Sequence, residues 1–124
     1  MKIVFLDRKT LGYDINLDRF NTLGDVTIYE TTKANETLGR VQNADIVVTN
    51  KVVLNKDILE KSNIKLICVI ATGTNNIDLE YAKQRGIEVK NVVGYAKATV
   101  AQLTFTFALH FIQKLDYYKK YVED

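Results

Sequence analysis

The sequence predicts a doubly wound α/β fold, in which helices cover a parallel sheet of five strands. Five short apolar runs alternate with helix-like segments up to residue 89, and three of these runs are continuous. Continuous apolar runs are typical of parallel strands that helices cover on both faces. The alternation of strands and helices favours the strand order 2-1-3-4-5. The five runs are residues 3–6, 26–29, 46–48, 66–70 and 87–89.

Segments with helix start and stop signals lie between these runs. Asn55 is expected to cap one helix, because its side chain can accept a hydrogen bond from a backbone N–H of the first turn. Asn76 is expected to cap the next helix, which Arg85-Gly86 would close. Two earlier helices are expected from apolar residues at helical spacing: Leu17, Phe20 and Leu23 in one, and Leu38 and Val41 in the other.

The last segment differs from the rest because it is apolar on every side. Residues 97–122 contain neither glycine nor proline. They predict one long helix of roughly 40 Å, at about 1.5 Å per residue. A helix that is apolar all round is normally buried between layers or between chains. We therefore expect two domains, residues 1–95 and 96–124, of which the second is a helix that leads to another domain and supports a homo-oligomer.

Composition excludes several classes of function. Lys and Arg number 17 against 15 for Asp and Glu, and no basic stripe suggests a nucleic-acid partner. No apolar run approaches the length of a membrane span, and the first residues lack the flanks of a signal peptide. The only cysteine, Cys68, lies in an apolar run, so we expect a core residue in a reducing, cytoplasmic compartment. We expect no metal site.

The loop after the fourth predicted strand, residues 72–76, carries groups suited to a small anion. Gly73 allows an unusual backbone angle or the close approach of a ligand. Successive backbone N–H groups around it can form an anion-binding concavity, and the hydroxyls of Thr72 and Thr74 add donors. The alternative is an ordinary strand-to-helix turn that Asn76 caps.

The loop after the third predicted strand is expected to lie beside the first. Asn50 offers a donor and an acceptor, and Lys51 offers positive charge. Ligands of doubly wound folds bind at the carboxyl ends of the strands, where both loops lie. An ordinary solvated turn is the alternative here too.

Several blocks of residues resemble the N-terminal, substrate-binding portion of the D-isomer-specific 2-hydroxyacid dehydrogenases. Within that family the resemblance is greatest to the glycerate dehydrogenase or hydroxypyruvate reductase branch. The first 40 residues match only in their strand pattern, whereas the blocks cover most of the second half of the chain. The blocks are residues 47–52, 71–79, 85–87, 91–95, 99–102 and 104–105.

The resemblance implies a flavodoxin-like substrate domain and a second, similar domain, with substrate and NAD in the cleft between them. The backbone amides around Gly73 and Thr74, beside Thr72, would hold the carboxylate of a small 2-keto acid such as hydroxypyruvate or glyoxylate. The loop of Asn50 and Lys51 would assist them. The product would be a D-2-hydroxy acid, and the preferred 2-keto acid stays open.

The resemblance places Thr99 and Val100 near the nicotinamide of NAD, and it places the catalytic Arg, Glu and His of the family in the nucleotide domain. The six glycines of this chain contain no G-x-G pair. We therefore expect a truncated N-terminal part of an NAD-dependent enzyme, with no catalytic residue and no tight cofactor binding of its own. The only histidine, His110, has no carboxylate four residues away and is expected to be packed rather than catalytic.

A stand-alone flavodoxin-like binding or regulatory module that self-associates through its long helix is the alternative hypothesis. A phosphoacceptor receiver domain is one example, and Asp7 at the end of the first strand would suit its acidic pocket. However, Thr49-Asn50 stands where a receiver needs an aspartate.

Overall fold

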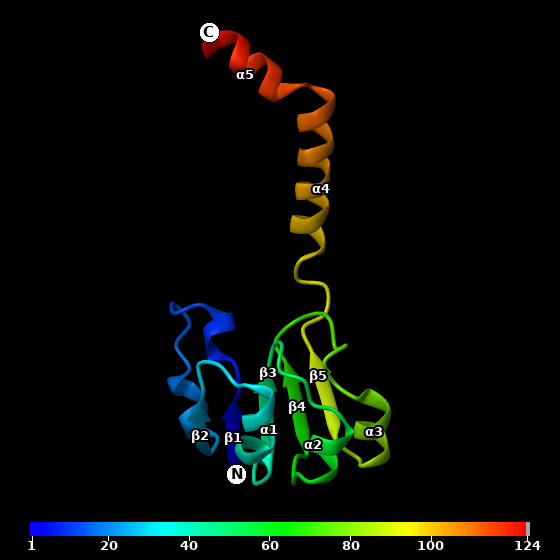
Figure 1. Ribbon diagram of the computed structural model, residues 1–124. Coiled ribbons are helices and arrows are strands. Elements are labelled where there is room, and N and C mark those ends of the chain that lie inside the picture. Colours follow the sequence, from blue (N-terminus) through cyan, green and yellow to red (C-terminus); the bar gives the residue numbers. More distant parts are fainter. Residues whose placement is uncertain (124) are drawn as a thin grey trace. The chain divides into compact units, whose positions relative to one another are not determined.

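The computed structural model describes residues 1–123. The chain divides into two compact units, which begin at Met1 and at Gly94. The first unit holds a five-stranded sheet in the order β2-β1-β3-β4-β5, and every pair of neighbouring strands is parallel (Figure 1). The predicted fold class and strand order are confirmed. The strands are β1 (Lys2–Phe5), β2 (Asp25–Ile28), β3 (Ile46–Thr49), β4 (Leu66–Val69) and β5 (Glu88–Asn91).

Three of the four predicted crossovers contain an α-helix, but the segment between β1 and β2 does not. It forms two short 3₁₀ helices, so the helix expected around Phe20 is wrong. The side chain of Asn16 accepts a hydrogen bond from the backbone N–H of Asp18 at 2.6 Å. Such local bonds compete with a regular helix. The helices of this unit are η1 (Arg8–Leu11), η2 (Asp18–Thr22), α1 (Ala34–Val41), α2 (Lys56–Glu60) and α3 (Leu79–Gln84).

One of the two predicted helix caps is confirmed. Asn55 accepts a hydrogen bond from the N–H of Ile58 at 3.2 Å and caps α2. The cap of α3 is Asp78, whose carboxylate accepts from the N–H of Tyr81 at 2.9 Å. Asn76 does not cap this helix, because its side-chain amide is bonded to carbonyl groups of the neighbouring loop instead.

The two faces of the sheet are covered unequally. All three α-helices bury a residue in the core on one face, through Val41, Leu59 and Ala82. Within residues 1–93, no α-helix packs on the other face, where Phe20 of η2 covers Phe5 of β1 with ring centroids 5.1 Å apart. The helices that pack on this second face are therefore 3₁₀ helices rather than α-helices. Further along this face, three side chains of β3, of β4 and of the residue after β4 are only half-buried: Ile46, Cys68 and Ile70.

The position of Cys68 makes its thiol slow to react. Burial raises the pKa of this thiol, and the nearby carboxylate of Glu88 raises it further. The thiolate is the reactive form, and a raised pKa lowers its fraction at a given pH. We expect Ellman's reagent at pH 8 to modify Cys68 more slowly in the folded chain than in the chain unfolded by guanidinium. Equal rates in the two states would contradict this placement of the thiol.

The second unit consists of two helices rather than the predicted single one. They are α4 (Lys97–Ile112) and α5 (Leu115–Glu123). The chain turns at Lys114, whose φ of 51° lies in the left-handed region. A hydrogen bond of 2.8 Å between His110 and Asp116 spans this turn. The predicted length of 40 Å is therefore wrong, since 16 residues of α4 extend about 24 Å at 1.5 Å per residue.

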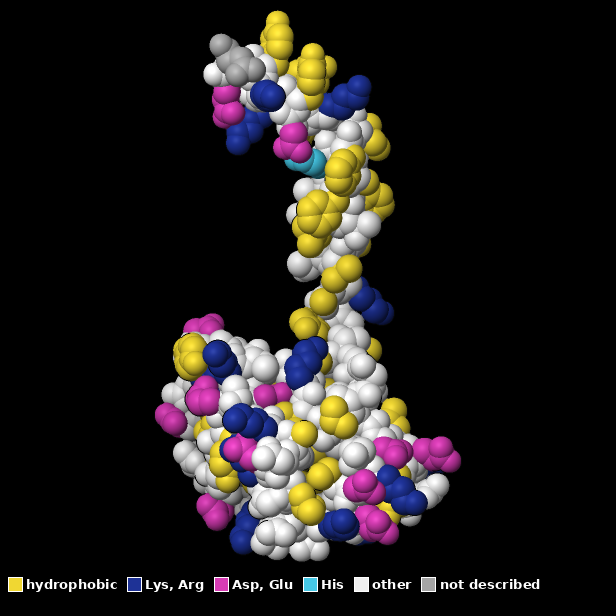
Figure 2. Space-filling view, in the orientation of Figure 1, with side chains coloured by type: hydrophobic (Ala, Val, Ile, Leu, Met, Phe, Trp, Pro, Cys, Tyr) yellow, Lys and Arg dark blue, Asp and Glu magenta, His cyan; other side chains and the backbone are white. Residues whose placement is uncertain are grey.

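Apolar side chains are exposed along both helices of this unit (Figure 2). Neither α4 nor α5 has a buried residue among those described. No helix in residues 1–123 combines the length and the apolar character that a membrane span requires. The exposed large aliphatic and phenylalanine side chains of the two helices are Val100, Leu103, Phe105, Phe107, Leu109, Phe111, Ile112, Leu115 and Val122.

Candidate functional site

The loops after β3 and β4 line one cavity of about 270 Å³ at the carboxyl edge of the sheet. The structure thus brings together Asn50, Lys51 and Gly73, three of the five residues predicted to bind a substrate carboxylate. Thr72 and Thr74 are not among the residues that line it. The lining consists of Asn50, Lys51, Val53, Ala71, Gly73, Asn75 and Asn76.

The carboxylate of Asp7 anchors the first of these loops. Asp7 lies just beyond β1 and is only 6% exposed. It accepts hydrogen bonds from the backbone N–H of Asn50 at 2.9 Å and of Lys51 at 2.7 Å, and from the hydroxyl of Thr49 at 3.3 Å. These two N–H groups are therefore not available to a ligand, and the loop can contribute only its side chains.

This role of Asp7 was missed by the sequence analysis, which considered the residue only for a receiver domain. The available signal was an acidic residue directly after a buried strand, where ligands of this fold bind. The receiver alternative loses support, because the carboxylate is engaged by the loop of residues 49–51 rather than open to a metal ion.

The two loops are bonded to each other. The backbone N–H of Leu54 donates to the carbonyl of Asn76 at 2.9 Å, and the N–H of Asp78 donates to the carbonyl of Leu54 at 3.1 Å. The side-chain amide of Asn76 donates to the carbonyl of Val52 at 3.0 Å. Leu54 is fully buried. The cavity therefore lies between two loops that form a short parallel bridge.

The second loop presents backbone donors without protein partners. In the described chain, the backbone N–H groups of Gly73, Thr74 and Asn75 donate to no other protein atom. The last residue of β5 holds this loop, since the side-chain amide of Asn91 donates to the carbonyl of Thr72 at 2.7 Å. Successive free N–H groups are the donors that a small anion requires.

Gly73 does not adopt an unusual backbone angle. Its φ is not among the positive values found in the described residues, so that part of the prediction is wrong. A Cβ atom at this position would lie 3.3 Å from Oδ1 of Asn75, and the residue is exposed. A side chain here would occupy the space beside the free N–H groups.

The charge of the cavity lining also suits an anion. Lys51 is the only charged residue among the residues that line it, and its side chain is exposed.

The oxygen Oδ1 of Asn50 is buried and has no hydrogen-bond partner in the described structure. An unpaired buried polar atom of this kind costs about 1–3 kcal/mol.

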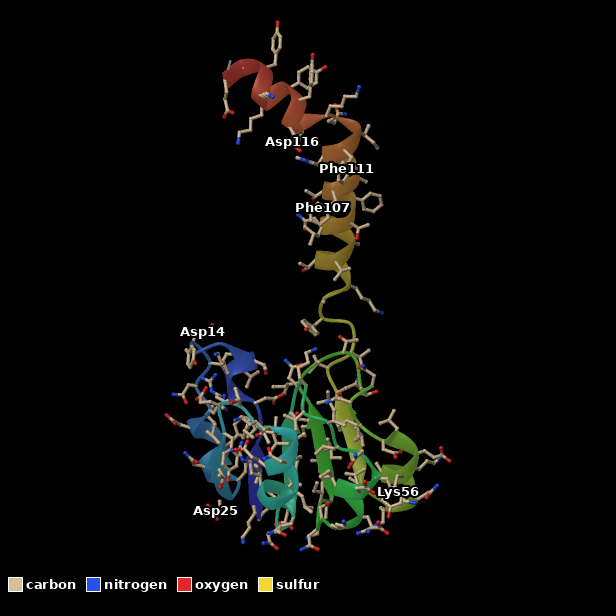
Figure 3. The ribbon with its side chains drawn as sticks, in the orientation of Figure 1. Asp14, Asp25, Lys56, Phe107, Phe111 and Asp116 are labelled. Atoms are coloured by element: carbon tan, nitrogen blue, oxygen red, sulfur yellow. The ribbon has the colours of Figure 1, made fainter. Side chains whose placement is uncertain are left out.

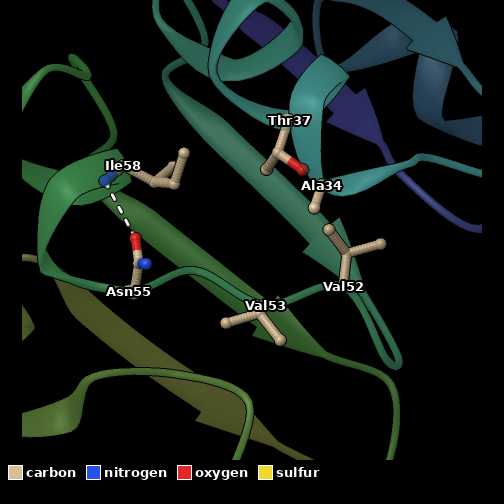
Figure 4. A pocket seen from close by; sticks show the side chains of 6 residues that line it. All are labelled: Ala34, Thr37, Val52, Val53, Asn55 and Ile58. Carbon is tan, nitrogen blue, oxygen red and sulfur yellow. Dashed lines mark hydrogen bonds between the residues drawn. The ribbon is translucent and has the colours of Figure 1, made fainter.

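A second cavity, of about 300 Å³, lies beside the first (Figure 4). It is lined by residues of α1 and α2 and by the segment between β3 and α2, and Val53 belongs to the lining of both cavities. None of the lining residues is ionisable, and Thr37 and Asn55 are the polar residues among them. The lining residues are Ala34, Thr37, Val52, Val53, Asn55 and Ile58.

The residues predicted to lie near a nicotinamide belong to the second unit. Thr99 and Val100 are in the first turn of α4, and both are exposed. His110 lies on the same helix, and its ring is bonded to the carboxylate of Asp116 at 2.8 Å. These two residues are six apart in the sequence, so the four-residue spacing of a helix does not indicate the pair. No cluster of three or more His, Cys, Asp or Glu side chains suited to a metal ion occurs in residues 1–123.

The first unit is an α/β domain with a cavity at the carboxyl edge of its sheet, and comparison with known proteins identifies the family of the chain. The model of the D-isomer specific 2-hydroxyacid dehydrogenase catalytic domain matches residues 4–119. The chain belongs to the D-isomer specific 2-hydroxyacid dehydrogenase family.

Relatives with known names agree with this assignment. A putative 2-hydroxyacid dehydrogenase of Haemophilus influenzae is 45% identical over 82% of this chain and 33% of its own length. A hydroxypyruvate reductase of Blautia hydrogenotrophica is 33% identical over 100% of this chain and 40% of its own length. The chain thus spans between a third and two fifths of these relatives.

A solved structure shares the fold. The acyclic imino acid reductase Bsp5, in complex with NADPH and D-Arg, superposes with a TM-score of 0.80 and 25% sequence identity. The match covers 94% of this chain and 39% of the reductase.

Proposed function

We propose that the chain is the substrate-binding domain of an NAD-dependent 2-hydroxyacid dehydrogenase that reduces a small 2-keto acid to the D-2-hydroxy acid. Hydroxypyruvate and glyoxylate are the proposed substrates, and a relative named hydroxypyruvate reductase supports this choice. The observation that carries the proposal is the row of free N–H groups on Gly73, Thr74 and Asn75 beside Lys51.

The proposed role of these residues is to hold and orient the substrate. The N–H groups of Gly73 and Thr74 donate to the carboxylate, and Lys51 adds a positive charge. Fixing the carboxylate leaves the 2-keto carbon in one orientation, which lowers the barrier to hydride transfer. None of the residues in this chain is proposed as the catalytic acid or base.

Only one short segment of this chain is proposed to contact a nicotinamide cofactor. We propose that Thr99 and Val100, both exposed at the start of α4, lie against the nicotinamide. When bound, the cofactor supplies the hydride. The chain has no glycine pair for its phosphates, so we expect the chain by itself to bind the cofactor weakly and to be inactive.

We also propose that residues 94–123 bind a second copy of this chain. The support is the exposure of large apolar side chains along α4 and α5. Each such side chain gains about 1.5–3 kcal/mol when it is fully buried. A contact between two copies would bury several of them at once.

The 2-keto acid site is tested by placing a side chain at Gly73. We expect Gly73→Val to weaken glyoxylate binding by about tenfold or more, because the added carbons occupy the place of the carboxylate. Affinity is measured from the amide chemical shifts of the ¹⁵N-labelled chain. Shifts that map away from residues 73–75 would contradict the proposed site.

Gly39→Val is the matched control for this substitution. Gly39 lies in α1, where a Cβ would meet nothing within 4 Å. The same chemical change is therefore expected to leave glyoxylate binding unaltered.

A further inference from the structure

The position of Asp7 presents an electrostatic problem for an anion-binding site. Its buried carboxylate is bonded to two residues that line the cavity, Asn50 and Lys51. A negative charge so close to the cavity disfavours a second negative charge. Asp7 therefore does not bind the anion directly, and any contribution it makes to the site is through the residues that it holds in place.

We propose that Asp7 is a positioning residue of the 2-keto acid site, which holds the Asn50-Lys51 loop in place without contacting the substrate. This inference rests on the proposed function. Both carboxylate oxygens take part, since the N–H of Asn50 lies 2.9 Å from Oδ1 and 3.0 Å from Oδ2. The N–H of Lys51 and the hydroxyl of Thr49 bond to Oδ2.

The hold on the loop also decides which amides can bind an anion. The N–H groups of Asn50 and Lys51 point to Asp7, whereas those of Gly73, Thr74 and Asn75 stay free. Asp7 thereby assigns the carboxylate of the substrate to the second loop and leaves the first loop to contribute its side chains. The N–H donors also place partial positive charge against the Asp7 carboxylate, which reduces its repulsion of the substrate.

Asparagine at position 7 would break this arrangement while keeping the size of the side chain. The substitution replaces one carboxylate oxygen by an NH₂ group. This group is a hydrogen-bond donor, so it cannot accept a bond from a backbone N–H. We expect Asp7→Asn to speed amide hydrogen exchange at Asn50 and Lys51, and to weaken glyoxylate binding, each by at least about tenfold.

The matched control is Asp45→Asn. The carboxylate of Asp45 also accepts a backbone N–H, from Lys2 at 2.9 Å, but it lies directly before β3, at the opposite end of that strand. The two sites are independent, so Asp45→Asn is expected to leave glyoxylate affinity and exchange at the loop within about twofold of the wild-type chain.

Thr49→Val keeps the inference testable if Asp7→Asn does not fold. Thr49 is fully buried, and its hydroxyl donates to Asp7 and accepts from the N–H of Val52 at 3.1 Å. Valine removes both contacts at the same volume, and we expect a several-fold loss of glyoxylate affinity. In Asp7→Asn, by contrast, the amides that shift with glyoxylate should include Asn50 or Lys51, because their N–H groups lose the carboxylate; a loss of stability alone does not produce this change in pattern.

The outcomes separate the two proposals. If Asp7→Asn or Thr49→Val folds and binds glyoxylate as the wild type does, or if Asp45→Asn loses as much affinity, the positioning role is overturned. If the wild-type chain shows no glyoxylate-dependent shift at residues 73–75, the proposed function fails, and the role of Asp7 toward the substrate fails with it. Exchange at Asn50 and Lys51 still reports in that case whether Asp7 orders the loop.

Discussion

Replacing Leu54 by alanine is expected to lower the free energy of unfolding by about 2–5 kcal/mol, the usual range for a buried leucine. Leu54 is fully buried, and its backbone bonds to both Asn76 and Asp78 in the second loop. The side chain therefore supports the core and the bridge between the two site loops. Chemical denaturation measures the loss of stability, and the glyoxylate titration measures the accompanying loss of affinity.

Val53→Ala is the control for this prediction. Val53 is the preceding residue in the chain, is 58% exposed and lines the carboxyl-edge cavity. We expect it to change the free energy of unfolding by less than about 0.5 kcal/mol, as surface substitutions usually do. Equal losses for the two variants would show that the burial of Leu54 does not stabilise the bridge.

The double variant Phe107→Asp with Phe111→Asp is expected to convert a self-associated chain into a monomer. The two residues lie four apart on α4, hence on one side of the helix, and are 57% and 77% exposed (Figure 3). Removing two phenylalanine contacts costs about 3–6 kcal/mol of association, at 1.5–3 kcal/mol each. Sedimentation velocity at several concentrations measures the change.

The double variant Gln102→Asp with Thr106→Asp separates lost contact from added charge. It places the same two charges on the same helix at the same spacing, but at positions that are already polar. We expect it to weaken self-association less than the phenylalanine variant does. A wild-type chain that sediments as a monomer at high micromolar concentration would refute the proposed contact between copies.

The strands of this fold are predictable because their apolar runs are long enough to be recognised in the sequence without knowledge of tertiary contacts. The break at Lys114 was not predictable, since no glycine or proline marks it and the bond between His110 and Asp116 spans six residues. The second 3₁₀ helix, η2, places Phe20 on Phe5, a contact that sequence spacing does not specify.

The candidate site was predictable in its loops but not in its supports. Asn50, Lys51 and Gly73 were found because parallel strands bring their following loops to one edge. Asn76 was misassigned as a helix cap because its amide bonds to a loop more than 20 residues away. Asp7 was missed in this role because a carboxylate beside an anion site has no rationale until its N–H partners are known.

The bridge between Leu54 and Ile77 has an entropic consequence. Ordering the backbone of one flexible residue costs about 1–2 kcal/mol. The two site loops are bonded to each other, and Asp7 holds the first of them, so the binding of a 2-keto acid does not have to order them. A ligand of only a few atoms offers few contacts to offset such a cost. A preorganised pair of loops therefore suits substrates as small as the ones proposed.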